Sequence, residues 1–124
     1  MASGAIEFEL GSETQSTRAV RRAMAVHFAA SARLDDLLLC VSEVVSNAVL
    51  HAGPPVRIVA ERVGGGIRVE VTDCSAVMPV RGTPDAHSPT GRGLLLLEAL
   101  SSEWGVAQAP PGKTVWFVID GVAT

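Results

Sequence analysis

The spacing of apolar residues changes several times along the chain, and each change marks a new element. Over Ala5–Leu10 apolar and acidic residues alternate, which predicts a half-buried strand that ends at Gly11 and Ser12. From about Thr14 or Ser16 to near Ala30 apolar residues recur every three or four positions, so a helix is expected there. The amino-terminal part of the chain is therefore predicted to form a strand followed by a helix.

A second, longer helix is predicted to run to about His51 or Ala52. Ser31 is a suitable N-cap for it, and Gly53 followed by two prolines is a suitable stop. At about 100° per residue, one face of this helix forms an apolar stripe. The stripe consists of Leu34, Leu38, Val41, Val45, Ala48 and Ala52.

Glu43, Asn47 and His51 are spaced four residues apart and form a polar line on the other side of this helix. Leu39 and Leu50 lie near that line, so we expect the helix to be covered on both sides. Buried polar groups need partners, which a ligand or a metal ion can supply. A salt-bridged or solvated helix edge explains the same three residues equally well.

The second half of the chain reads as two hairpins separated by a long loop and a helix. Strands are predicted over Val56–Val63 and Gly66–Asp73, joined by glycines, and over Trp104–Ala109 and Lys113–Ile119, joined by Pro110-Pro111-Gly112. The last strand is expected to be buried on both faces. Between the hairpins, Cys74–Thr90 lacks periodicity and predicts a loop, and Leu94–Leu100 predicts a helix.

Two features of this half suggest a binding site. The period of two places Asp73 on the apolar face of its strand, where it either caps a turn or accepts hydrogen bonds from a ligand. Thr90-Gly91-Arg92-Gly93 directly precedes the helix, and free amides at a helix start can bind an anion. A flexible hinge is the alternative interpretation of these glycines.

Composition narrows the class of protein. A chain of 124 residues with 48% hydrophobic residues predicts one domain, over 1–124, with a real core. The net charge of -3 disfavours direct nucleic-acid binding, although Arg18, Arg21 and Arg22 form a local basic patch that is either solvated surface or a docking site for an acidic partner. We find neither a membrane-length apolar run nor a signal peptide, and we expect a soluble cytoplasmic protein.

Taken together, the polar residues resemble those of a known family. The matching pattern is Glu43-x-x-x-Asn47-Ala-x-x-His51, then Asp73, then Gly91-x-Gly93-Leu94, then Gly112-Lys113-Thr114. In order and spacing it resembles the GHKL group of ATP-binding domains, which includes gyrase B, Hsp-type chaperones, histidine kinases and mismatch-repair ATPases. Within this group the chain looks most like the single-domain anti-sigma-factor serine/threonine kinases of bacteria.

The resemblance implies a fold and a set of roles. The fold is the Bergerat ATP-binding fold, an α/β two-layer sandwich of a mostly antiparallel mixed sheet with helices on one face. In the family's pattern Asn47 coordinates Mg²⁺ and Glu43 is the general base for a serine hydroxyl. Asp73 binds the adenine amino group, and Thr114 supports it. The nucleotide-binding set implied for ATP is Asn47, His51, Asp73, Thr90, Gly91, Arg92, Gly93, Leu94 and Thr114.

The resemblance also implies partners, and the sequence departs from the family in one place. The implied partners are a sigma factor and an anti-sigma antagonist, with a possible homodimer. The family usually has Gly-x-Gly after its aspartate, whereas this chain has Ser75 and Val77, which predicts weaker nucleotide binding. Two functions therefore compete: a serine/threonine kinase that regulates a sigma factor, and a module that regulates a partner by binding alone. The catalytic half of a histidine kinase is disfavoured, since 124 residues leave no room for a dimerising hairpin.

Overall fold

A computed structural model describes residues 5–11, 17–53, 55–75 and 89–121, with only the backbone described for 89–93. Within these ranges the chain forms three helices and five strands. In chain order they are β1 (Ile6–Leu10), α1 (Thr17–His27), α2 (Leu34–Ala52), β2 (Val56–Val63), β3 (Gly66–Asp73), α3 (Pro89–Leu100), β4 (Glu103–Ala109) and β5 (Gly112–Ile119).

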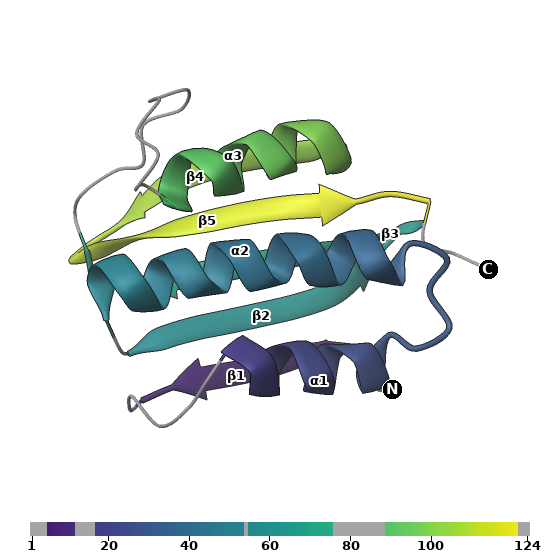
Figure 1. The fold of residues 1–124 in the computed structure, drawn as a ribbon, viewed down its shortest axis with the longest axis horizontal. Helices are drawn as coiled ribbons and strands as arrows, with labels where there is room; N and C mark the ends of the chain where they lie inside the picture. Colours follow the sequence, from purple (N-terminus) through teal and green to yellow (C-terminus); the bar gives the residue numbers. More distant parts are fainter. Residues whose placement is uncertain (1–4, 12–16, 54, 76–88, 122–124) are drawn as a thin grey trace.

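The strands form one sheet in the order β1-β2-β3-β5-β4, and all four neighbouring pairs are antiparallel. The three helices lie side by side over one face of this sheet, with α2 between α1 and α3 (Figure 1). The predicted α/β two-layer sandwich with helices on one face is therefore confirmed.

The core lies between α2 and the sheet. Val41 and Val45 of α2 are fully buried, as are Ile67 and Val69 of β3. Val71, Asp73 and the other residues at every second position of β3 face the helices, because successive side chains in a strand point to opposite faces. The alternation read from the sequence thus correctly predicts which side of β3 is covered.

Two expectations about α2 are wrong. The helix begins at Leu34, and its N-cap position is occupied by Arg33 without a side-chain capping bond, whereas Ser31 lies in the preceding turn. The outer side of the helix is also open: Leu39 is 43% exposed and Leu50 is 67% exposed. The reason is that a single sheet provides one apolar layer, so the helix surface opposite the sheet remains in solvent.

The helix predicted from Leu94 begins five residues earlier, at Pro89. Proline suits the first turn of a helix because it has no N–H to leave unpaired there. Most of the predicted loop, including Val77, falls at 76–88, outside the described residues. No helix in the described ranges is long and apolar enough to cross a membrane.

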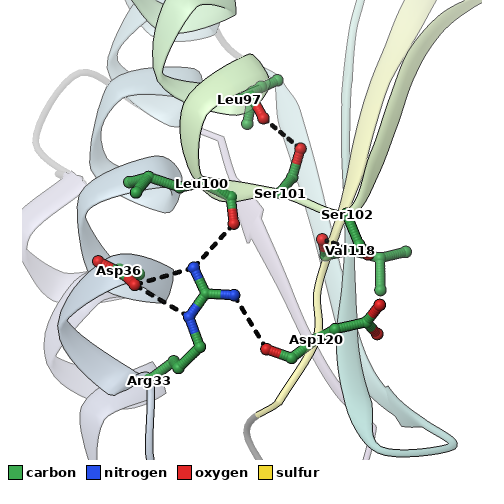
Figure 2. Close-up of polar contacts among 8 residues, drawn as sticks. All are labelled: Arg33, Asp36, Leu97, Leu100, Ser101, Ser102, Val118 and Asp120. Carbon is green, nitrogen blue, oxygen red and sulfur yellow. Dashed lines mark hydrogen bonds and ion pairs between the residues drawn. The ribbon is translucent and has the colours of Figure 1, made fainter.

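One arginine joins three elements at the end of the molecule where α2 begins. The Arg33 guanidinium donates hydrogen bonds to the carbonyl oxygen of Leu100 at the end of α3, at 2.9 Å, and to that of Asp120 just after β5, at 3.0 Å (Figure 2). It also pairs with Asp36 in the first turn of α2, at 2.9 Å. These contacts fix the ends of α3 and β5 relative to the start of α2.

Candidate functional site

The polar line on α2 lies on one flank of that helix. Ser46 marks the flank toward α1, because its Oγ is 3.1 Å from Oγ1 of Thr17. Helical spacing places Asn47 on the other flank, toward α3. Glu43 and Asn47 are half-buried, whereas His51 is exposed in the last turn. The structure thus brings Glu43 and Asn47 to one side of α2, one turn apart.

Asn47 has the chemistry of a ligand for a hard cation. Its Oδ1 atom is buried and accepts no hydrogen bond among the described residues, although the residue makes another contact. Amide oxygens are ligands that Mg²⁺ takes, usually together with water and the phosphates of a substrate. Among the described residues no group of three or more His, Cys, Asp or Glu side chains is arranged to hold a metal ion. The described residues would therefore hold a cation together with further ligands, such as water and the phosphates of a bound molecule.

Asp73 ends β3 on the face covered by helices, and its side chain is only 4% exposed. Oδ1 accepts a hydrogen bond from the Ser75 N–H at 2.8 Å and one from Lys113 Nζ at 3.1 Å. Nζ is also 3.1 Å from Oδ2. The carboxylate therefore caps the turn that follows β3 and forms a buried ion pair, so capping, one of the two interpretations of Asp73, is observed directly.

Lys113 occupies the place beside Asp73 that the family resemblance assigned to Thr114. Asp73 and Lys113 are directly opposed across β3 and β5, and the next pair along the sheet is Thr72 with Thr114. Neighbouring pairs point to opposite faces of a sheet. Thr114 accordingly lies on the face without helices, with its Oγ1 at 2.8 Å from Oγ1 of Thr72.

The structure does not bring Thr114 together with Asp73; Lys113, which was not predicted as a site residue, lies there instead. A signal was available, because the period of two in the last strand puts Lys113 in line with Val115 and Phe117. Without the register between β3 and β5, however, no pattern within the strand shows which of the two residues meets Asp73.

Gly112 allows β3 and β5 to approach closely where Asp73 and Lys113 meet. A Cβ atom at this position would lie 1.7 Å from the carbonyl oxygen of Asp73, which is far inside van der Waals contact. A residue without a side chain is therefore required for β5 to begin this close to the end of β3. The close approach places Lys113 in reach of the Asp73 carboxylate.

Thr90, Gly91, Arg92 and Gly93 lie within the first turns of α3, not in a loop before it. The first amides of a helix have no partner inside the helix and carry its positive end, which suits an anion. Leu94, the next residue, is 4% exposed and belongs to the hydrophobic core. Burial of its side chain in the core therefore anchors the first turns of α3.

Several of the sequence-predicted residues belong to segments at one end of the domain. The end of α2, the end of β3, the start of α3 and the start of β5 all lie at the end of the domain opposite to the start of α2 (Figure 1). An amide in the second half of α2, the ion pair of Asp73 and Lys113 and the start of α3 therefore belong to segments at the same end, whereas Glu43 lies at the middle of α2. Their chemistry suits a ligand that carries phosphates and a hydrogen-bonding ring.

Comparisons with known proteins identify the family and a similar fold. A family model described as a histidine kinase-like ATPase domain matches residues 7–119. Among solved structures, the catalytic domain of histidine kinase ThkA, in a nucleotide-free form, is similar with a TM-score of 0.56 and 14% identity. The match covers 94% of this chain and 95% of that one, and at this identity it concerns the fold. No curated protein matches the chain significantly.

Proposed function

The chain belongs to the family of histidine kinase-like ATPase domains, and we propose that it is an anti-sigma factor with serine/threonine kinase activity. In this proposal it binds ATP with Mg²⁺ and holds a sigma factor inactive. It phosphorylates an antagonist protein that would otherwise release the sigma factor. It acts in the cytoplasm, as a homodimer.

The family match carries the nucleotide-binding part of the proposal. It spans residues 7–119 and therefore includes α2, the end of β3, the start of α3 and the start of β5. The kinase part is supported by Glu43, a half-buried carboxylate one turn before Asn47 on the same flank of α2. A base in this position is next to the site proposed for the phosphates.

Each residue has a distinct role in the proposed reaction. Asn47 would hold the Mg²⁺ ion, which would supply neutralisation of the phosphate charge. Asp73 reads the base, and the amides at the start of α3, between Thr90 and Gly93, bind the phosphates. Glu43 takes the proton from the serine hydroxyl, whose oxygen forms a bond to the γ-phosphorus while the bond from that phosphorus to the β-phosphate oxygen breaks. ADP is the leaving group.

A second candidate function is regulation by contact alone. It is favoured by the contacts of Asp73, whose carboxylate is already engaged by Lys113 and the amide of Ser75. It is also favoured by Ser75, a side chain where the family commonly has glycine. In that case the chain binds its partner without transferring phosphate.

Calorimetric titration with ATP, with and without Mg²⁺, tests the first part of the proposal. Binding that requires Mg²⁺ is expected. The second part is tested by transfer of labelled γ-phosphate to candidate antagonist proteins from the same genome. Glu43→Gln should bind ATP normally but transfer phosphate ~10²–10⁴-fold more slowly, which is the usual loss on removing a general base.

Glu103→Gln is the matched control, since Glu103 is an exposed carboxylate in β4. It should transfer phosphate at the normal rate. Absence of ATP binding would refute the proposed site. ATP binding without transfer to any candidate would favour the contact-only regulator, and normal transfer by Glu43→Gln would exclude Glu43 as the base.

A further inference from the structure

We propose that Lys113 is a specificity-determining residue that reads the nucleobase together with Asp73. The ammonium supplies a donor and the carboxylate an acceptor, so that the pair accepts purine nucleotides with either an amino group or a carbonyl oxygen at ring position 6. This inference rests on the proposed nucleotide site and defines its preference among nucleotides.

The geometry of the pair is the first support. Lys113 Nζ lies 3.1 Å from each oxygen of the Asp73 carboxylate, and the two side chains are 10% and 4% exposed. They are directly opposed on neighbouring strands, and Gly112 lets the strands approach closely. A ligand that contacts the Asp73 carboxylate must therefore also meet the Lys113 ammonium.

The hydrogen bonds already formed show what the pair can still offer. Oδ1 of Asp73 accepts two hydrogen bonds, whereas the described residues give Oδ2 only the contact with Lys113. One acceptor position on Oδ2 is thus available to a ligand. The third contact of Nζ, with the carbonyl oxygen of Ser75, is long at 3.4 Å, so a better-placed acceptor can replace it.

The two purine edges fit this pair in opposite orders. Adenine carries an amino donor at position 6 and an acceptor at N1, whereas hypoxanthine carries a carbonyl acceptor at position 6 and an N–H donor at N1. A carboxylate alone accepts from adenine and repels a carbonyl oxygen. A carboxylate next to an ammonium offers each ring one acceptor and one donor. The site therefore discriminates less between adenine and hypoxanthine than a carboxylate alone would.

Stability alone does not account for a lysine here. A buried ion pair costs desolvation of both charges, and replacing such a pair with apolar residues is often neutral or stabilising. Val71 and Val115 show that the next opposed pair on this face of the sheet is apolar. A charged pair at the edge where the ligand is expected therefore points to recognition.

The test compares ATP with ITP, which differ only at position 6 and the N1 proton. Calorimetry on the wild-type chain is expected to give affinities within about tenfold of each other. In Lys113→Met, where Asp73 acts as an acceptor alone, ITP should lose at least tenfold more affinity than ATP. The ratio of the two affinities cancels effects on the phosphates and on overall stability.

Thr72→Val is the matched control, because it changes the residue of β3 next to Asp73 on the opposite face of the sheet and should leave the ratio unchanged. Lys113→Arg keeps a donor and a charge and should retain binding of both nucleotides, which provides a second test if Lys113→Met does not fold. Wild-type preference for ATP above about 100-fold, or an unchanged ratio in Lys113→Met, overturns the inference while the nucleotide site stands. Binding of neither nucleotide overturns the site itself, and the inference with it.

Discussion

Arg33 and Leu100 are joined across 67 residues of sequence by a 2.9 Å hydrogen bond from the guanidinium to the backbone carbonyl oxygen. Leu100 is the last residue of α3, where carbonyl groups have no partner inside the helix. The same guanidinium reaches the carbonyl oxygen of Asp120 (Figure 2). One side chain thus fixes the end of α3 that is remote from the proposed phosphate site.

Arg33→Met should therefore destabilise the fold. Hydrogen bonds from a charged donor contribute about 1.5–3 kcal/mol, and the substitution removes one to the partly buried carbonyl of Leu100 and one to the exposed carbonyl of Asp120, so we expect the free energy of unfolding to fall by about 2 kcal/mol. Urea denaturation measures the change. The control is Arg57→Met, which removes an ion pair with Glu7 between two side chains more than half exposed and should have little effect. Equal effects of the two substitutions would contradict the role of Arg33.

Gly112→Ala should disturb the site and the sheet together. The added Cβ would lie 1.7 Å from the carbonyl oxygen of Asp73, so the start of β5 must move. Overpacking of this kind typically costs about 1–3 kcal/mol, and the displacement should separate Lys113 from Asp73. Thermal unfolding measures the first effect, and nucleotide titration the second. Gly65→Ala is a suitable control, since no atom lies within 4 Å of a Cβ at that position; a wild-type melting temperature for Gly112→Ala would contradict the structure.

The free energy of unfolding should decrease at high pH because of the Cys40 thiol. Burial, and then the charge of Asp36, raise the pKa of Cys40 from 9.0 to about 11 in the folded state. Between these values the unfolded chain releases the thiol proton and the folded chain keeps it. The folded state then binds more protons, and its stability falls as the pH rises through this interval.

The measurement is the difference in free energy of unfolding between the wild type and Cys40→Ala. Cys40→Ala starts from a lower stability because it leaves a cavity, but it lacks this titration. The difference should shrink between pH 9 and 11 by about 1.4 kcal/mol for each unit of pKa shift. Parallel pH profiles would show that Cys40 titrates normally in the folded protein.

Asn47→Ala should weaken ATP binding in the presence of Mg²⁺ without unfolding the chain. The affinity for ATP should fall by about 100-fold. This is the upper end of the loss usually seen when a residue that supports a metal ion is removed. Asn47→Asp is the control, because it keeps an oxygen ligand at the same place and should retain binding that depends on Mg²⁺. Unchanged affinity of a folded Asn47→Ala for Mg·ATP would rule out Asn47 as the ligand.

The sequence alone determined the elements and the faces of most of them. The bounds predicted for β2 and β3 match the structure. A period of two on either side of a glycine turn is typical of a β-hairpin, and the turn marks where one strand ends and the next begins. The apolar stripe of α2 was predicted correctly, and Val41 and Val45 from it are fully buried. Such patterns are local, and burial of an apolar face follows from them directly.

Helix starts were predicted less well. Ser31 and Leu94 were expected at or near the starts of α2 and α3, which begin at Leu34 and Pro89. Arg33 explains the first difference, because contacts with Leu100 and Asp120 hold the backbone there in place of a local cap. A helix start set by distant carbonyls leaves no local signal.

Only the tertiary structure decided which residue meets Asp73. The chain offers Lys113 and Thr114 as neighbours in one strand, and they point to opposite faces of the sheet. The choice depends on the register between β3 and β5, and a shift by one residue would exchange the two. Register across 40 residues of sequence is fixed by packing of the whole sheet, including the close contact at Gly112, and for that reason the sequence identified Asp73 but not its partner.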